Sequence, residues 1–342
     1  KNVYEKEGSV KGLWHGNRER LQDYRLLSHD AIESFIERRK SVDPEKVHRE
    51  ILESGVQAYP YYHPNYPFRL REISDPPMII YMKGELEPHD LRHSCAIVGT
   101  RQPTAYGQRL AKEFARELSA CGVAIVSGMA IGIDSLAHWG AIEGGGKTVA
   151  VLASGVDICY PSSNKPLYQK LLKGTHGAVI SEFAPGTKPE SWRFPARNRI
   201  ISGLCQALVV IEAGESSGSL ISAKLAFEQS REVFAVPGRI DSPASRGTNM
   251  LIQRNLAHLC HGYEHVMKEL GWVKASPIRE VPTVVELFGK ERELYDLISA
   301  EPVHFDYLCE KADIPAPELS ATLTMLELAG VITRHPGDWY SK

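Results

Sequence analysis

One short segment concentrates side chains that can bind an anion. The sequence FPARNRIISG places Arg197, Asn198 and Arg199 among residues of types that are usually buried. Arginine presents N–H donors in a planar fork that fits the oxygens of a phosphate. A buried arginine also needs a partner, so a structural ion pair with Glu182 or Glu212 is the alternative interpretation. We expect at least one of the three side chains to contact phosphate or base.

A Gly- and Ser-rich loop follows this segment. An apolar strand ends at Ile211, and the sequence then reads EAGESSGS before a predicted helix. The first backbone N–H groups of a helix have no partner within it and bind anions. We predict a phosphate cradle at Ser217, Gly218 and Ser219, with Lys224 one or two turns into the helix. Capping of the helix by a serine hydroxyl is the structural alternative.

Two earlier loops carry residues of the same kind. Gly99, Thr100 and Arg101 end the first predicted strand, where the glycine permits a tight turn and the arginine can reach a phosphate. Ser127 and Gly128 follow the second strand, and the glycine allows a ligand to approach the backbone closely. An ordinary surface arginine is the alternative for Arg101.

The second of these loops lacks the common nucleotide motifs. Its glycines are spaced Gly128-x-x-x-Gly132, which is neither the GxGxxG of dinucleotide sites nor a P-loop. Binding of NAD or ATP is therefore not favoured. Asp134 is predicted either to cap the following helix or to bond a ribose. His138 on that helix has no nucleophile beside it in the sequence and is predicted to pack.

A fourth polar loop follows the sixth predicted strand. It includes the sequences VPG and SRGTN and is long enough to close over a site at the strand ends. Gly247 and Asn249 in this loop complete the set of residues that we predict to bind phosphate. No acid–base pair lies beside any of these loops, so the pattern favours holding phosphates over cleaving bonds.

The elements that must position these loops alternate between strand and helix. Short apolar runs predict strands at 95–99, 124–127, 148–152, 178–181, 207–211 and 233–236. Helical patterns between and after them cover 106–120, 133–143, 165–173, 217–229 and 247–257. Such alternation predicts an α/β fold with an extended Rossmann-like, doubly wound parallel sheet, whose ligands bind at the carboxyl ends of the strands. The candidate loops fall at that edge.

Composition bounds the remaining possibilities. The chain has 342 residues, 43% hydrophobic and 24% charged, as in an ordinary globular protein of two or three domains. It contains no apolar run long enough to span a membrane, and the sequence at its N-terminus does not resemble a signal peptide, so we expect a cytoplasmic protein. The six cysteines include no C-x-x-C pair, which favours free thiols over a zinc site.

We divide the chain into four parts. Residues 1–85 form a small N-terminal helical region, for which a SAM-like fold is one candidate, with amphipathic helices expected at 21–39 and 44–54. Residues 86–270 form the Rossmann-like core, 271–284 a linker and 285–342 a C-terminal winged-helix domain. A run of tyrosines and prolines from Tyr59 to Pro67 is expected to form a packing layer without regular structure, and base stacking is the alternative.

The charge is distributed unevenly between these parts. Residues 285–342 hold eleven acidic and five basic residues, which gives them a net charge of −6. Because the whole chain has a net charge of −2, the other residues together carry +4. The domain should contain helices at 290–300, 305–312 and 317–329 and a hairpin over 331–340. The third helix has no Lys or Arg and two glutamates, and duplex phosphates would repel it. We therefore favour a protein-interaction or packing role over DNA contact.

The motifs together resemble the DNA-processing protein A family (DprA, also called Smf). The matching sequences are VGTR (98–101), SGMAIGIDSLAH (127–138), FPARNRIISGL (194–204), EA and SGSLI (212–221), and VPG and GTNMLI (236–252). Each motif alone is modest, whereas five in order at matching spacings are specific. The resemblance covers residues 56–260 most strongly.

The resemblance implies a function. It implies a core that binds and protects incoming single-stranded DNA, forms a homodimer and helps to load a RecA-type recombinase during natural transformation, with no catalytic activity, cofactor or metal. Arg101, Arg197 and Arg199 would contact phosphates. The family often has arginine where this chain has Ile131, so one candidate contact is absent.

Two other functions are open at this point. A nucleotide-processing enzyme, similar to the phosphoribohydrolases of the lysine-decarboxylase-like type, would need carboxylates as acid and base near the Gly/Ser loop, where Glu215 and Glu228 are the candidates. A purely structural adaptor would have no affinity for nucleic acid.

Overall fold

The computed structural model describes residues 11–25, 28–272, 289–299, 302–312, 314–328, 331–335 and 337–341. It divides into two compact units, Lys1–Pro277 and Ile278–Lys342, each described by itself. The predicted linker, residues 271–284, lies outside the described residues after Trp272. In the described part of the chain, no helix is both long and apolar enough to cross a bilayer.

The first unit is built on a nine-stranded sheet. Its strands are β1 (Gln57–Pro60), β2 (Ile79–Gly84), β3 (Ser94–Val98), β4 (Ala124–Ser127), β5 (Thr148–Val151), β6 (Gly177–Ser181), β7 (Ala207–Val210), β8 (Glu232–Ala235) and β9 (His258–Leu259). They are ordered β1-β2-β6-β5-β4-β3-β7-β8-β9. Strands β3 to β9 pair in parallel, whereas β2 runs antiparallel to β1 and β6. The doubly wound sheet predicted from the sequence is confirmed, and its winding direction reverses between β3 and β7.

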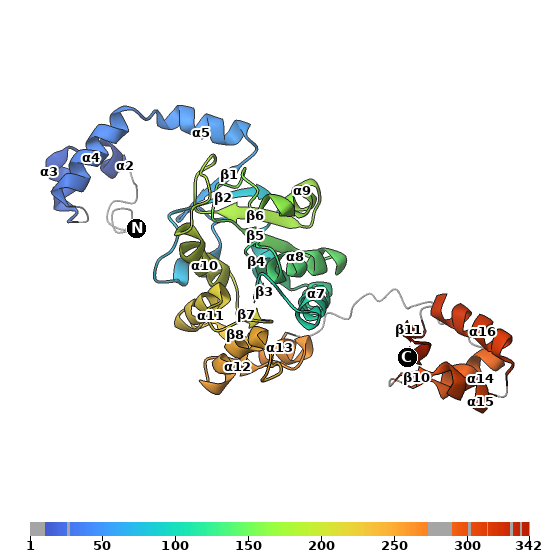
Figure 1. Ribbon diagram of the computed structural model, residues 1–342. Helices are drawn as coiled ribbons and strands as arrows, with labels where there is room; N and C mark the ends of the chain where they lie inside the picture. Colours follow the sequence, from blue (N-terminus) through green and yellow to red (C-terminus); the bar gives the residue numbers. More distant parts are fainter. Residues whose placement is uncertain are drawn as a thin grey trace. The chain divides into compact units, whose positions relative to one another are not determined.

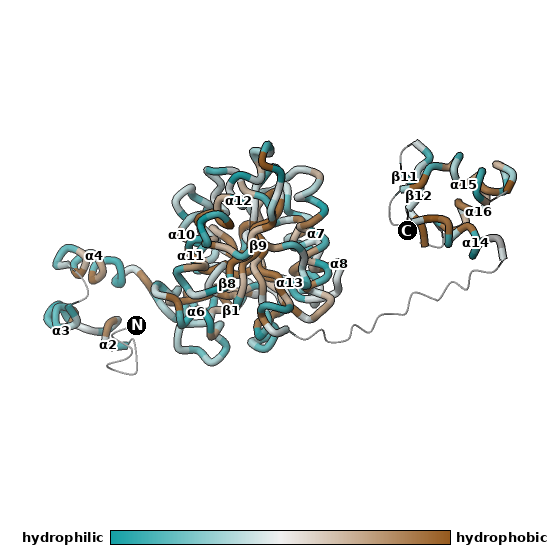
Figure 2. The backbone as a smooth tube through the Cα atoms, turned by 90° about the horizontal axis from the view of Figure 1, so that it is seen from below, coloured by the Kyte–Doolittle hydropathy of each residue, from teal (hydrophilic) through white to brown (hydrophobic). Residues whose placement is uncertain are grey.

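Helices cover both faces of this sheet (Figure 1). One face carries α7 (Ala105–Ala120), α8 (Ile133–Glu143), α9 (Lys165–Lys173) and α13 (Tyr263–Glu269), and the other carries α6 (Phe68–Glu72), α10 (Arg193–Gly203), α11 (Gly218–Glu228) and α12 (Arg246–Gln253). Side chains alternate along β3, so that Ala96 and Val98 pack toward α10 while Cys95 and Ile97 pack toward α7. Figure 2 shows the resulting hydrophobic interior of the sheet. All six cysteines are free thiols.

The N-terminal part differs from the prediction in two places. The helix expected over 21–39 is two helices, α3 (Arg18–Asp23) and α4 (His29–Lys40), because the Ser28 side chain accepts from the N–H of Ala31 and begins a new helix. Two other helices, α2 (Lys11–His15) and α5 (Pro44–Glu53), flank this pair in the sequence. The expectation that prolines exclude regular structure is wrong for Pro60, which belongs to β1, an edge strand where proline is tolerated.

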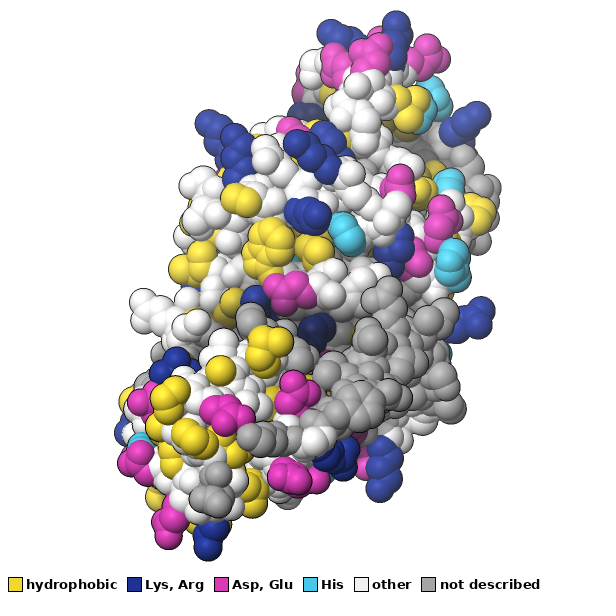
Figure 3. Space-filling view, turned by 90° about the vertical axis from the view of Figure 1, so that its right-hand side faces the viewer, with side chains coloured by type: hydrophobic (Ala, Val, Ile, Leu, Met, Phe, Trp, Pro, Cys, Tyr) yellow, Lys and Arg dark blue, Asp and Glu magenta, His cyan; other side chains and the backbone are white. Residues whose placement is uncertain are grey.

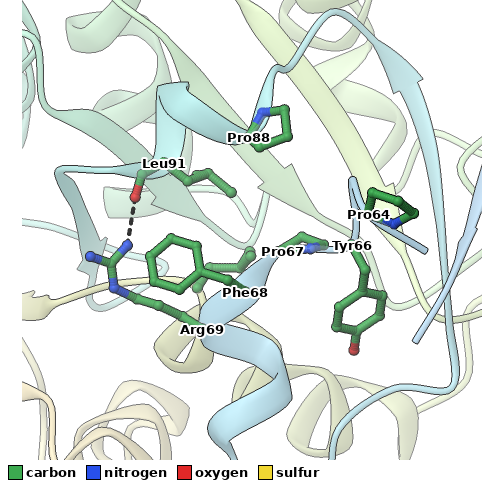
Figure 4. A pocket seen from close by; sticks show the side chains of 8 residues that line it. Pro64, Tyr66, Pro67, Phe68, Arg69, Pro88 and Leu91 are labelled. Atoms are coloured by element: carbon green, nitrogen blue, oxygen red, sulfur yellow. Dashed lines mark hydrogen bonds between the residues drawn. The ribbon is translucent and has the colours of Figure 1, made fainter. Parts of the chain in front are cut away.

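The tyrosines and prolines after β1 pack against the core. Tyr66 is buried, and its hydroxyl donates to the carbonyl oxygen of Pro77 at 2.7 Å. Beside it lies a cavity of about 60 Å³. Figure 4 shows the side chains that line it, among them prolines and Phe68, Arg69 and Leu91. Arg69 does not offer its charge to this cavity, because its guanidinium donates to the carbonyl oxygens of Leu91 and of the following residue. The cavity is therefore a packing feature of the tyrosine–proline layer.

The second unit is the predicted winged helix. It contains α14 (Lys290–Leu297), α15 (Phe305–Ala312) and α16 (Ala316–Leu328), with β10 (Val303–His304), β12 (Trp339–Ser341) and β11 (Thr333–His335) in an antiparallel sheet of that order. Its leucines and isoleucines form a separate core. The predicted helix ends at Ala300 and Ala329 lie outside the described residues. In the lower part of Figure 3 this unit shows more acidic than basic side chains on the face in view.

A buried histidine joins α8 to β5. His138 is fully buried, and its Nδ1 lies 2.7 Å from Oγ1 of Thr148. Burial, followed by the charge of Arg197, lowers the pKa of His138 from 6.5 to about 3. The folded protein therefore keeps this imidazole neutral at pH values where the unfolded chain protonates it.

This burial predicts a specific acid sensitivity. Between about pH 6.5 and about pH 3 the unfolded chain binds one more proton at His138, so the free energy of unfolding should fall by about 1.4 kcal/mol per pH unit of acidification. The free energy of unfolding can be measured by urea denaturation at about pH 7 and at about pH 5. Between these two pH values it should fall by about 2 kcal/mol less for His138→Gln than for the wild type. His48→Gln, at an exposed position on α5, is the matched control. An unchanged acid dependence in His138→Gln would contradict this assignment.

Candidate functional site

A cleft opens at the carboxyl ends of the central strands, where the winding of the sheet reverses. Its volume is about 770 Å³, and it is lined by residues of five segments: the loop after β3, the loop after β4, the segment between β5 and α9, α10 with the residues before it, and the loop after β7 with the start of α11. Doubly wound sheets bind their ligands at this topological position. Eight predicted residues line the cleft: Gly99, Thr100, Arg101, Arg197, Asn198, Ser217, Gly218 and Ser219.

The loop after β3 is held rigidly between β7 and α8. The N–H of Thr100 donates to the carbonyl oxygen of Glu212 at 2.7 Å, and the carbonyl oxygen of Thr100 accepts from the N–H of Ile133 at 3.2 Å. Gly132 has a φ of +83°, and a Cβ at this position would lie 2.5 Å from the oxygen of Thr100. The close approach of the two loops therefore requires a glycine here.

Glu212 closes the same loop from the other side. Its buried carboxylate accepts from the N–H of Thr104 at 2.9 Å and from the Thr104 hydroxyl at 2.6 Å. Thr104 in turn caps α7, since its hydroxyl accepts from the N–H of Gly107. Glu212 thus fixes the start of α7 to the end of β7. It does not pair with the arginines of α10.

Arg101 projects from this rigid loop with its charge uncompensated. The residue is exposed, and within the described part of the chain it forms no ion pair. Its guanidinium carbon lies 6.0 Å from the centre of the Phe194 ring, within cation–π range. An exposed cation on a fixed loop beside an aromatic ring can bind a phosphate without first breaking another ion pair.

Arg197 forms the floor of the cleft and is committed to internal contacts. It is 5% exposed, and its Nη1 donates to the carbonyl oxygen of Gly128 at 2.8 Å and also to that of Val151. Burial lowers the pKa of Arg197 to about 10, while the negative charge of Asp134 opposes the shift and the positive charge of Arg101 adds to it. The guanidinium ties α10 to the loop after β4 and to the end of β5.

Asp134 is the countercharge of Arg197 and organises the loop after β4. Its Oδ2 accepts from the N–H of Gly128 at 3.1 Å and from the N–H of Ala130 at 3.4 Å. Burial raises the pKa of Asp134, and Arg197 and these N–H donors oppose the shift. A Cβ on Gly128 would lie 2.6 Å from Nη2 of Arg197, so this pair requires a glycine there. Asp134 therefore holds the loop, in place of the helix cap or the ribose contact that we considered.

Arg199 points away from the cleft. Its guanidinium pairs with Glu182 at 2.6 Å and with Asp75 at 3.0 Å, and it does not line the cleft. Residues two apart on a helix lie on different faces, which separates Arg199 from Arg197 on α10. The structural ion pair with Glu182, the alternative that we weighed, is the arrangement that the structure shows.

The start of α11 faces the cleft. The Ser217 hydroxyl caps the helix by accepting from the N–H of Ser219 at 3.4 Å, and the two hydroxyl oxygens lie 2.7 Å apart. Ser217 therefore both caps α11, as the structural alternative predicted, and lines the cleft. Lys224 lies outside this lining, and its ammonium is 3.7 Å from Glu228.

The other predicted residues support the loops and do not line the cleft. The hydroxyl of Ser127 donates to the carbonyl oxygen of Ile97 at 2.6 Å, and the N–H of Gly247 donates to that of Ala213 at 2.8 Å. Asn249 exchanges two hydrogen bonds with the backbone of Gly238. These contacts shape the neighbouring turns.

Tyr160 lines the cleft and was absent from the prediction. It lies in the segment between β5 and α9, and its ring centre is 5.6 Å from that of Phe194. No local sequence pattern indicated this contact, because the two residues lie far apart in the chain. Ile131 is also on the cleft wall and is 44% exposed.

The carboxylates proposed for an enzyme do not enter the cleft. Glu215 lies 3.9 Å from Arg246, and Glu228 pairs with Lys224. Among the described residues, Asp134 is the one carboxylate that lines the cleft, and it accepts hydrogen bonds from the backbone N–H groups of Gly128 and Ala130. This arrangement favours the binding of an anion.

Comparisons with known proteins agree with this architecture. The family model for DNA recombination-mediator protein A matches residues 57–271, and the model for the DprA winged helix domain matches residues 280–338. Protein Smf of Synechocystis sp. is 30% identical over 97% of this chain and 92% of its own length. The DNA processing protein DprA of Bacillus subtilis is 42% identical over 64% of this chain and 72% of its own length.

Two solved structures of related proteins share the fold. DNA processing protein A from Streptococcus pneumoniae superposes with a TM-score of 0.69 at 34% identity, covering 78% of this chain and 91% of that one. The protein of the same name from Helicobacter pylori, described with a single-stranded DNA binding mode, gives 0.56 at 29% identity and covers 63% of this chain and 95% of that one. The chain belongs to the DNA recombination-mediator protein A family, with a DprA winged-helix domain as its C-terminal unit.

Proposed function

We propose that this protein binds single-stranded DNA in the cleft at the ends of β3 and β7. The observation that carries the proposal is Arg101, an exposed cation on a rigid loop that faces Phe194 and the start of α11. The single-stranded DNA binding mode described for the Helicobacter pylori relative supports it.

The chemistry of the cleft suits a phosphate backbone with unpaired bases. Arg101 offers a charged N–H fork, and the hydroxyls and first N–H groups of α11 offer neutral donors on the facing wall. Phe194 and Tyr160 present aromatic surface between them, on which a base can stack without regard to sequence. We therefore expect little sequence preference and a marked dependence of affinity on salt.

The wider role is that of a mediator. We propose that a homodimer of this chain protects incoming single-stranded DNA and helps to load a RecA-type recombinase during natural transformation. Membership of the recombination-mediator family supports this role. A binding function without catalysis fits a cleft whose lining carboxylate, within the described residues, already accepts hydrogen bonds from the backbone.

Removing the free cation should weaken DNA binding selectively. Arg101→Ala should lose ~10- to 100-fold in affinity for a single-stranded oligonucleotide, because a charge-assisted contact contributes about 1.5–3 kcal/mol. The slope of log affinity against log salt should become shallower by about 0.7, the value for one phosphate contact on a single strand. Fluorescence anisotropy at several salt concentrations measures both quantities.

The control for this variant removes the same charge elsewhere. Arg116 lies eleven residues into α7, outside the cleft lining, and pairs with Glu117 on the surface. The control variant is Arg116→Ala. It should leave both affinity and salt slope unchanged. If Arg101→Ala and Arg116→Ala lose equal affinity for the oligonucleotide, the effect of Arg101 is explained by net charge alone. That result would contradict a binding site at the cleft.

Adding a cation to the cleft wall should strengthen binding. Ile131→Arg places a guanidinium on an exposed position of the lining, so affinity for single-stranded DNA should rise about tenfold and the salt slope should steepen by about 0.7. Leu52→Arg, at an exposed apolar position on α5, is the matched control. If both substitutions raise affinity equally, the gain is a nonspecific charge effect, and this proposal for the cleft wall fails.

A further inference from the structure

An exposed tryptophan stands at the rim of the cleft. Trp192 is the residue before α10, and its side chain is 59% exposed. Its neighbours in sequence, Ser191 and Phe194, both line the cleft, whereas Trp192 itself does not. The indole therefore lies beside the opening, outside the hydrophobic core.

This indole is held in place by three separate contacts. Its Nε1 donates to Oε2 of Glu190 at 2.6 Å, and its ring packs edge-on against Phe183 with centres 6.2 Å apart. The guanidinium of Arg193 lies 4.9 Å from the Trp192 ring and 5.1 Å from the Phe183 ring. Arg193 is itself fixed by Glu190 at 3.2 Å and by a hydrogen bond to the carbonyl oxygen of Lys188.

A fixed and largely exposed indole is an unusual use of a large apolar side chain. With more than half of its surface in water, Trp192 gains little of the free energy that burial would supply. Its orientation is nevertheless determined by a hydrogen bond, a ring contact and a cation. A preorganised aromatic surface loses little entropy when a second flat group stacks on it, which is the requirement for binding an unpaired base.

The charges around the indole match a polynucleotide. Lys188 and Arg193 come from the same segment, and Glu190 is engaged by both Trp192 and Arg193. An adjacent cation strengthens stacking on an indole and attracts the neighbouring phosphate. The segment thus combines a stacking surface with a positive surrounding, next to the phosphate-binding cleft.

We propose that Trp192 is a base-stacking platform that extends the single-stranded DNA path from the cleft over the residues before α10. Trp192, supported by Phe183 and Arg193, stacks on a base of the strand whose phosphates Arg101 binds. The platform adds affinity without sequence preference, because every base has an aromatic face. This inference rests on the proposed function of the cleft and identifies a further contact of the same ligand.

The first test measures the tryptophan directly. Binding of a single-stranded oligonucleotide should quench part of the intrinsic fluorescence, since a base stacked on the indole quenches it. The chain has five tryptophans, so Trp192→Phe should lose most of this change while still binding DNA. Trp339→Phe, at an exposed position of the winged-helix unit, is the control and should keep it.

The second test separates stacking from a structural role. Trp192→Ala should weaken binding of a normal oligonucleotide about tenfold without changing the salt slope, because no phosphate contact is lost. An oligonucleotide of equal length with abasic sites should bind the wild type and Trp192→Ala almost equally. Trp192→Tyr should restore most of the affinity, and the thermal melting of each variant reports on its fold.

The outcomes distinguish this inference from the function on which it rests. If the wild type binds single-stranded DNA through Arg101, but Trp192→Ala binds as tightly and no quenching depends on Trp192, the platform is wrong and the cleft stands. If Trp192→Ala weakens normal and abasic oligonucleotides equally, the residue acts through structure and the platform is also wrong. If the wild type does not bind single-stranded DNA, both proposals fail.

Discussion

The hydrogen bonds of two buried charged residues, Arg197 and Asp134, to the backbone beneath the cleft are the contacts on which the candidate site depends. Arg197 reaches from α10 to the carbonyl oxygens of Gly128 and Val151, and Asp134 gathers the N–H groups of the loop after β4. Three segments that are far apart in the chain are thereby held at one point beneath the cleft. Loss of either side chain would leave buried backbone groups of these segments without their hydrogen-bond partners, which is destabilising in proteins.

Arg101 differs from Arg197, because it lines the same cleft from an exposed position. Its loop is fixed by backbone hydrogen bonds to Glu212 and Ile133, so the guanidinium starts from a defined position. Arg197 lines the same cleft, and its pKa is lowered mainly by burial, to which the positive charge of Arg101 adds. Arg197 is buried and holds the cleft together, whereas Arg101 faces the solvent, although the sequence analysis predicted a phosphate contact for both.

The fold could be predicted largely from the sequence because its signals are local. Apolar runs such as Ala124–Ser127 and the amphipathic pattern of α7 mark the central elements within a residue or two. Strands β1, β2 and β9 were missed: Pro60 suggested a turn at β1, β9 is a short exposed strand, and β2 lies in the segment that we expected to be helical. Ser28 separates α3 from α4 through a capping bond that the apolar periodicity did not reveal.

The sequence by itself determined the alternation of the central strands β3 to β8 with helices, the edge of the sheet at which the loops gather, and the family motifs that they carry. Only the tertiary structure decided which polar residues face the cleft. Arg197 and Arg199 are alike in sequence, but the helical turn sends Arg199 to Glu182 and Asp75. Tyr160 enters the cleft from another segment. The residues that pair with a charged side chain come from distant parts of the chain. Local sequence patterns therefore cannot tell which arginines are paired and which are free.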